Sequence, residues 1–247
     1  MSIDDAIKLM IDEIMLHLSD SRPTIYLFGS VVRNDFKLGW SDIDFIALTE
    51  SELTTSQANS LVELRQRMQK RYPNNPYFRL FEGGILSADA FLNNKNECAV
   101  YWGTSGQRIT NNFKLDSFGI AELLDNGILL CGNDLRSKMS YPTYEQMRDD
   151  IANHMQIAKQ YGKTVGWLLD IARGIFTIRT GKIISKTAAG EWALKNSLCY
   201  DEEAMSRAIH IRKEPLKFLH EERNIDTCII QGFADVLDTE LQVDRKF

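Results

Sequence analysis

The chain has 247 residues, more than most single domains contain, so two domains of modest size are expected. Its hydrophobic content of 44% and charged content of 26% are those of an ordinary globular protein, and each half can bury a core. The net charge of −5 argues against a nucleic-acid partner, because nucleic-acid phosphates require a basic surface.

Cysteine spacing, histidine spacing and hydropathy exclude further classes of protein. The four cysteines and four histidines show neither Cys-x-x-Cys spacing nor a combined ligand cluster, which argues against zinc. The chain begins with an amphipathic, acidic pattern rather than a secretory signal, and no apolar run approaches the roughly 18 residues that cross a bilayer. We therefore expect a cytoplasmic protein with reduced thiols and no membrane partner.

The first predicted elements are a helix and a short strand. Apolar residues recur every three or four positions through about Leu18, which indicates a helix that covers a sheet. The run Ile25–Phe28 then indicates a buried strand, and Gly29 ends it, where a missing side chain lets the backbone approach a ligand closely. Ser30 follows at the start of a helical turn, whose backbone N–H groups and hydroxyl suit phosphate oxygens.

Two carboxylates open the next predicted strand, SDIDFIAL. Alternate residues of a strand project to one face, so Asp42 and Asp44 are expected to point at the same spot. Magnesium prefers carboxylate, phosphate and water oxygens, and two ions about 4 Å apart can serve both the attacking and the leaving oxygen. We expect two Mg²⁺ ions here, with Ser41 as a second hydroxyl. An EF-hand calcium loop is the rival interpretation, but the residues that follow lack its glycine, its further oxygen ligands and its final glutamate.

A third carboxylate follows a predicted helix at Thr55–Arg71 and a predicted strand at Tyr77–Phe81. Glu82 would end that strand beside the one that carries the aspartates, where it could accept the proton of an attacking hydroxyl. The alternatives are a third metal ligand or a surface residue. Arg33 is the main cation near these carboxylates that could contact nucleotide phosphates.

Two adjacent aromatic residues, Tyr101 and Trp102, are candidates for stacking on a base or a sugar ring, since aromatic faces provide large contact areas. Such a pair belongs to the core more often than to a binding site. Trp102 is retained as a candidate for acceptor binding.

The domain boundary is expected near Pro142, which cannot extend a preceding helix. Thr143 and Gln146 have the capping-box spacing that starts a new helix. This predicts an N-terminal domain at 1–141 and a helical bundle at 142–247.

Helical periodicity dominates the second domain. Gly181 is expected to end its second helix, and Ser185 to cap the next one.

Two blocks of sequence carry a resemblance to a known family. They are YLFGSVVRNDFKLGWSDIDFIAL at Tyr26–Leu48 and ARGIFTIRTGKIISKTAAGEWAL at Ala172–Leu194. The first resembles the signature of the nucleotidyltransferase superfamily that includes DNA polymerase beta. Together they most resemble the aminoglycoside adenylyltransferases that act on streptomycin and spectinomycin. The resemblance implies an α+β fold, in which a nucleotidyltransferase domain with a mixed sheet and flanking helices precedes an α-helical bundle.

The resemblance also implies roles for particular residues. Glu82 matches the glutamate that acts as the catalytic base, and Arg173 and Lys186 match cations that reach the ATP phosphates. The helical domain would then close the active-site cleft. The alternative is that Arg173 and Lys186 are ordinary helix-surface residues.

Acceptor recognition is where the chain departs from the family. The family has an acidic segment ahead of the arginine helix, whereas this chain has Gly162–Val165, which includes a lysine. Asp170 and Glu191 could replace that acidic segment in binding a cationic acceptor. Glu82 is a further candidate for acceptor binding, because the acceptor hydroxyl would react beside it.

The sequence thus predicts magnesium-dependent transfer of AMP from ATP to a hydroxyl of a small, polar, cationic or polyhydroxyl acceptor. The resemblance points to an aminoglycoside and to antibiotic resistance. The alternatives are a nucleotidyltransferase acting on RNA or on a protein hydroxyl, and a non-catalytic nucleotide-binding module.

Overall fold

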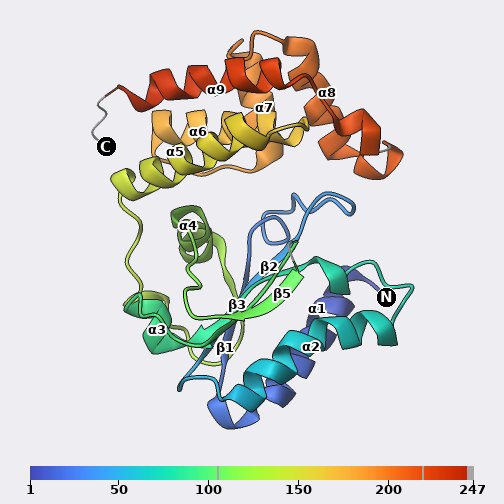
Figure 1. Ribbon diagram of the computed structural model, residues 1–247, viewed down its shortest axis with the longest axis vertical. Coiled ribbons are helices and arrows are strands. Elements are labelled where there is room, and N and C mark those ends of the chain that lie inside the picture. Colours follow the sequence, from blue (N-terminus) through green and yellow to red (C-terminus); the bar gives the residue numbers. More distant parts are fainter. Residues whose placement is uncertain (105, 219, 244–247) are drawn as a thin grey trace. The chain divides into compact units, whose positions relative to one another are not determined.

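The computed structural model of the protein describes residues 1–104, 106–218 and 220–243. The chain forms two compact units (Figure 1). One consists of Met1–Phe36 and Ser41–Tyr141, and the other of Lys37–Trp40 and Pro142–Phe247. The short segment 37–40, which the sequence analysis assigned to the first domain, therefore groups with the helical unit.

The first unit is built around a mixed sheet of six strands in the order β5-β4-β3-β2-β1-β6. Only the central pair, β2 and β3, is parallel, and every other neighbouring pair is antiparallel. The strands are β1 (Thr24–Phe28), β2 (Ile43–Thr49), β3 (Phe81–Ser87), β4 (Ala99–Gly103), β5 (Gly106–Thr110) and β6 (Ile128–Cys131).

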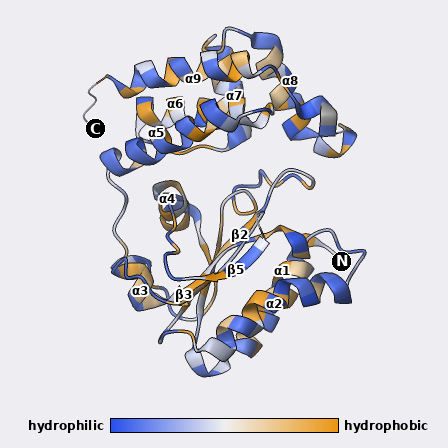
Figure 2. Ribbon diagram, viewed as in Figure 1, coloured by the Kyte–Doolittle hydropathy of each residue, from blue (hydrophilic) through white to orange (hydrophobic). Residues whose placement is uncertain are grey.

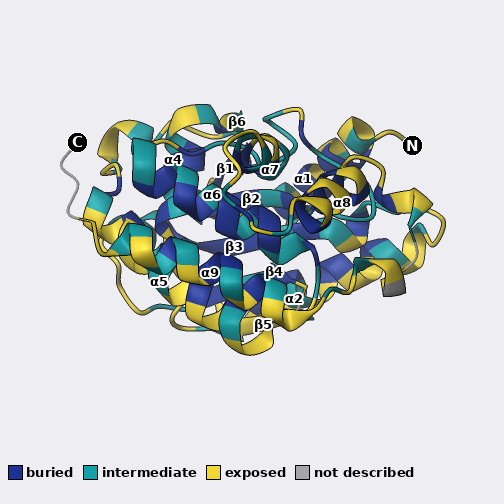
Figure 3. Ribbon diagram, turned by 90° about the horizontal axis from the view of Figure 1, so that it is seen from above, coloured by how far each residue is buried: buried dark blue, intermediate teal, exposed yellow. Residues whose placement is uncertain are grey.

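The two faces of this sheet bury different sets of side chains, because successive residues of a strand alternate between faces. Ile25 and Phe45 pack with residues of α1 (Ile3–His17) and α2 (Thr55–Arg71). Tyr26 and Ile46 face the other way, toward α3 (Ala88–Leu92) and α4 (Ser117–Asn126). The four inner strands, β1 to β4, are accordingly mostly buried, whereas the edge strands β5 and β6 and the outer sides of the helices are more exposed (Figure 3).

Local capping explains where several helices begin. Ser2 and Asp5 form a capping box at the start of α1, as do Thr54 and Gln57 at the start of α2. Each box satisfies backbone N–H groups that the first turn leaves unpaired. In both α1 and α2 the hydrophobic residues recur at helical spacing and are the buried ones, so each helix has stretches of both colours along its ribbon (Figure 2).

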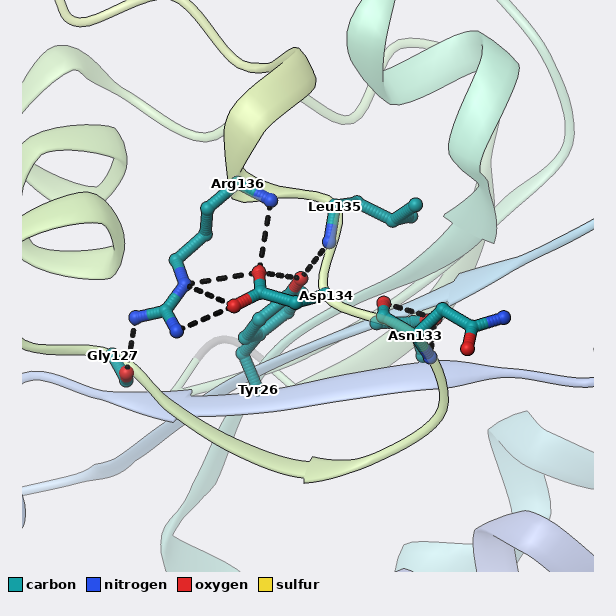
Figure 4. Close-up of polar contacts among 7 residues, drawn as sticks. Tyr26, Gly127, Asn133, Asp134, Leu135 and Arg136 are labelled. Atoms are coloured by element: carbon teal, nitrogen blue, oxygen red, sulfur yellow. Dashed lines mark hydrogen bonds and ion pairs between the residues drawn. The ribbon is translucent and has the colours of Figure 1, made fainter.

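A polar network fixes the end of β6 to β1. The Tyr26 hydroxyl donates to Asp134 Oδ1 at 3.0 Å and accepts from the Leu135 N–H (Figure 4). Arg136 donates to both carboxylate oxygens of Asp134 and to the Gly127 carbonyl. The hydrogen bonds from Arg136 hold the pKa of Asp134 far below its usual range.

One predicted strand is wrong. Residues 78–80 form a 3-10 helix, Phe78–Leu80, and the strand begins only at Phe81. Phe78 and Phe81 are both buried, and their spacing of three residues fits one helical turn rather than an extended strand. As a result, Glu82 is the second residue of β3 instead of lying at the end of a strand.

The second unit is helical, as predicted. Its helices are α5 (Tyr144–Tyr161), α6 (Gly166–Thr180), α7 (Lys186–Lys195), α8 (Glu202–Lys213) and α9 (Thr227–Leu241). The predicted capping box of Thr143 and Gln146, the left-handed Gly181 after α6 and the Ser185 cap of α7 are all confirmed. The central helix α6 contacts each of the other four.

Candidate active site

The turn after β1 places bare backbone against a carboxylate. Gly29 has a φ of 72°, a left-handed conformation that favours glycine. A Cβ atom at this position would lie 2.2 Å from Asp44 Oδ2. The Arg33 N–H bonds back to the Gly29 carbonyl oxygen at 3.1 Å, so the chain makes one tight turn here. Gly29 is therefore required both by the turn and by the position of Asp44.

The two aspartates lie at the start of β2. Asp42 immediately precedes the strand, Asp44 is its second residue, and both side chains are partly exposed. Ser30 Oγ donates to the Asp42 carbonyl oxygen at 3.3 Å, which ties the turn to the aspartate segment. Ser41 is buried, with only 5% of its surface exposed.

The donor atoms at this place suit a cation that shares its coordination with a phosphate. Asp42 and Asp44 supply hard carboxylate oxygens, which Mg²⁺ prefers, and the backbone at Gly29 leaves room beside Asp44. Within the ranges that the structure describes, no three His, Cys, Asp or Glu side chains form a cluster that could hold a metal ion. Two carboxylates leave further coordination positions open, so this donor set suits a metal that also takes oxygens from a bound nucleotide.

Glu82 lies next to Asp44 in the sheet. The parallel register pairs Asp44 with Glu82, so the two carboxylates occupy neighbouring positions on β2 and β3. In the same register Phe45 pairs with Gly83, and the two strands start at the same edge of the sheet. The Tyr101 hydroxyl donates to Glu82 Oε1 at 2.9 Å.

Arg65 is a residue that the sequence reasoning missed. It comes from α2, is 7% exposed, and donates to the carbonyl oxygens of Gly103 and Arg79 at 2.9 and 2.7 Å. Burial lowers the pKa of its guanidinium, and the nearby carboxylates of Glu82 and Asp42 oppose that effect. The sequence contains a sign of this role, because Arg65 lies on the apolar stripe of an amphipathic helix, where arginine is rare unless it is paired.

Arg33 was predicted to contact phosphate, and the structure pairs it with a carboxylate of its own unit. Arg33 Nε lies 2.6 Å from Glu122 Oε2 of α4, and the Glu122 side chain is 8% exposed. This ion pair anchors the turn that follows Gly29 to α4. The positive charge of Arg33 is therefore already balanced before any nucleotide binds.

Trp102 does not belong to a binding site. Its side chain is completely buried, its ring centroid lies 5.3 Å from that of Phe45, and Nε1 donates to the Leu61 carbonyl oxygen at 3.0 Å. Strand alternation explains the difference from Tyr101, since neighbouring residues of β4 face opposite sides of the sheet. The expectation that Trp102 contacts an acceptor was wrong.

The second unit brings together three of the predicted residues. Lys186 Nζ lies 2.8 Å from Asp170 Oδ1, and Arg173 lies 3.7 Å from the same oxygen. Burial disfavours the charged form of Asp170, but Lys186 and Arg173 together outweigh it, so the pKa of Asp170 lies below its usual range. Asp170 thus pairs with the chain's own cations, which corrects the expectation that it meets a cationic acceptor. Glu191 likewise pairs with Lys213, at 2.6 Å.

The segment Lys37–Trp40, between the turn and the aspartates, is held within the helical unit. The guanidinium carbons of Arg212 and Arg223 lie 5.6 and 5.5 Å from the centre of the Trp40 ring. Arg223 also donates to the carbonyl oxygens of Gly39 and Pro215, at 3.0 and 2.9 Å. The chain therefore leaves the first unit after Phe36, makes these contacts, and returns at Ser41.

Comparisons with known proteins agree with this architecture. Residues 10–78 match the family described as nucleotidyltransferase domain, and residues 142–228 match the family described as aminoglycoside adenylyltransferase, C-terminal domain. No curated protein matches the chain. In the described part of the chain, no helix is long and apolar enough to cross a membrane.

Among solved structures, the chain is similar to spectinomycin adenyltransferase AAD(9) from Enterococcus faecialis, determined with ATP and spectinomycin. The TM-score is 0.70 at 19% identity, over 95% of this chain and 97% of that one, which shows a shared fold. A toxin-antitoxin structure with AMP-PNP also matches, at 16% identity over 60% of this chain and 91% of that one, but its TM-score of 0.28 carries no argument. The match at residues 10–78 and the match at residues 142–228 together indicate a nucleotidyltransferase enzyme and support one of the aminoglycoside adenylyltransferase type.

Proposed function

We propose that the protein transfers AMP from ATP to a hydroxyl group of an aminoglycoside, with spectinomycin and streptomycin as the first acceptors to test. The observation that carries this proposal is the pairing of Asp44 with Glu82 on adjacent parallel strands, beside the bare backbone of Gly29. The Gly29 turn and the carboxylates of Asp44 and Glu82 thus lie at one end of the sheet, which supports a site for a phosphate, a cation and a proton acceptor.

Each residue has a specific role in the proposal. Gly29 and Ser30 present backbone N–H groups and a hydroxyl to the phosphates, and Ser41 offers a second hydroxyl. Arg33 holds the same turn through its ion pair with Glu122. Glu82 accepts the proton of the acceptor hydroxyl as that oxygen bonds to the α-phosphorus and pyrophosphate leaves.

Asp42 and Asp44 would hold magnesium, and we propose two ions. Bound magnesium would offset the negative charge of the triphosphate. Two positive side chains of the helical unit, Arg173 and Lys186, are the proposed further ligands of the nucleotide. Asp170 keeps these two side chains together when no nucleotide is bound, because it forms ion pairs with both.

The acceptor class is proposed from the comparison and not from particular contact residues. AAD(9), whose fold this chain shares, was determined with spectinomycin bound. Trp102, Asp170 and Glu191 make other contacts, so of the four predicted acceptor residues only Glu82 remains. If the acceptor is an aminoglycoside, turnover in a bacterial host would give antibiotic resistance.

The direct test is transfer of label from α-labelled ATP, with magnesium, to a panel of aminoglycosides that includes spectinomycin and streptomycin. We expect a labelled adenylylated product with at least one of them. Asp42→Asn should lower kcat/KM by roughly 100-fold or more, since it removes charge that acts on the developing transition state.

The matched control is Asp12→Asn, which makes the same change at an exposed position of α1. It should leave transfer unchanged. Transfer to no member of the panel, or equal turnover by wild type and Asp42→Asn, would overturn the proposal.

A further inference from the structure

Tyr101 is connected directly to the proposed base. Its hydroxyl donates to Glu82 Oε1 at 2.9 Å. In the antiparallel register of β3 and β4, Tyr101 lies opposite Gly84, two residues along β3 from Glu82 and on the same face of the sheet. A long aromatic side chain reaches such a diagonal neighbour. The hydrogen bond therefore follows from the strand register and is not an accident of side-chain placement.

Two glycines make room for this arrangement. A Cβ atom at Gly103 would lie 1.9 Å from the Tyr101 hydroxyl oxygen. A Cβ atom at Gly84 would lie 2.3 Å from Cε1 of Phe113, the ring that packs beside Tyr101. Any larger residue at either position would displace the tyrosine ring or its aromatic neighbour.

The Tyr101 ring is also held on its sides. The guanidinium carbon of Arg108 lies 4.5 Å from the ring centroid, and the Phe113 centroid lies 6.2 Å away. The strand that carries Tyr101 is fixed in turn by Arg65, which donates to the Gly103 carbonyl oxygen. A donor with this much support is preorganised, which is what a catalytic carboxylate requires of its partner.

We propose that Tyr101 is a positioning residue that holds the Glu82 carboxylate for proton transfer, an inference that rests on the proposed function. Tyr101 occupies one carboxylate oxygen, so the other oxygen accepts the proton of the acceptor hydroxyl. The acceptor oxygen forms its bond to the α-phosphorus, the bond to the pyrophosphate oxygen breaks, and pyrophosphate takes the electron pair. Tyr101 keeps its own proton throughout.

The test is a double-mutant cycle with Tyr101→Phe, Glu82→Gln and the double variant, assayed with ATP, magnesium and the aminoglycoside that wild type uses fastest. Tyr101→Phe should lower kcat about tenfold and leave the KM for ATP within twofold of wild type, because the lost contact orients the base without touching nucleotide. Glu82→Gln should cost roughly 100-fold or more. In the Glu82→Gln protein the second change should cost nothing further.

Tyr26→Phe is the matched control, because it also removes a tyrosine hydroxyl that donates to a carboxylate, that of Asp134. It should leave kcat unchanged. Urea unfolding of the four proteins of the cycle adds a readout that needs no turnover, and the midpoint shifts of the two single variants should be non-additive.

The outcomes separate this inference from the proposed function. Wild-type kcat in Tyr101→Phe, an equal loss in both backgrounds, or additive midpoint shifts would overturn the positioning role while AMP transfer stands. If wild type transfers AMP to no acceptor, the proposed function fails, and the unfolding cycle still decides whether Tyr101 and Glu82 are coupled.

Discussion

Replacing Gly29 with alanine tests whether the turn and Asp44 form one site. The left-handed φ of 72° costs an alanine about 1–2 kcal/mol of folding free energy. In addition, the new Cβ would lie 2.2 Å from Asp44 Oδ2, so the carboxylate or the turn must move by roughly 1 Å. A displacement of that size in a reacting site lowers kcat/KM by about 100-fold.

The control for Gly29→Ala is Gly181→Ala. Gly181 has a similar φ of 68° and ends α6 in the helical unit, so its replacement imposes comparable backbone strain without displacing Asp44. Urea unfolding should report similar losses of stability for both variants, whereas AMP transfer should fall only in Gly29→Ala. Full activity in Gly29→Ala, with its stability lowered as in the control, would refute the idea that Asp44 needs this bare backbone.

Three further variants test the network around the site and the packing of each unit. Asp170→Asn should destabilise the protein by about 2–3 kcal/mol at pH 7 in urea unfolding, because it leaves Lys186 unpaired, although that side chain is 32% exposed and partly solvated. Asp170 contributes to the free energy of unfolding above its unfolded pKa of about 3.9, and this contribution is lost as pH falls through its lower folded pKa. On acidification below about pH 4 the variant should therefore lose less stability than wild type. Equal slopes of unfolding free energy against pH for the two proteins would contradict the pairing. Trp40→Ala should lower the free energy of unfolding by about 2–3 kcal/mol in the same assay and increase proteolysis within residues 37–40. Unchanged cleavage there would show that the contacts of the Trp40 ring with the two arginines do not hold this segment. Tyr26→Phe should lower the free energy of unfolding by about 1–2 kcal/mol, since the hydroxyl donates to Asp134 and accepts from a backbone N–H. Unchanged stability would show that this network does not stabilise the fold.

Features fixed by local chemistry could be predicted from the sequence. The bounds of α2, the capping box of Thr143 and Gln146, and the Ser185 cap all depend on hydrogen bonds within four residues. The apolar run that follows the aspartates placed them at the start of a strand, and helical periodicity indicated a helical second unit; both are present.

Features that depend on contacts between distant segments could not be predicted in this way. The 3-10 turn at Phe78 and the burial of Trp102 follow from packing against α2, which the local pattern does not reveal. The pairing of Asp170 with Lys186 joins two helices, so a carboxylate that looked available for a cationic acceptor proved to be neutralised by the chain. The role of Tyr101 depends on strand register and on two glycines whose purpose is visible only in three dimensions.

The central claim, that Asp42 and Asp44 bind a cation together with the nucleotide triphosphate, is tested most directly by a crystal structure with Mn²⁺ and a non-hydrolysable ATP analogue. Anomalous scattering locates the metal without relying on its coordination. We expect a manganese peak about 2.0–2.3 Å from oxygens of both aspartates, with the triphosphate against the Gly29 turn. Manganese bound elsewhere, or a nucleotide that contacts neither aspartate, would contradict it.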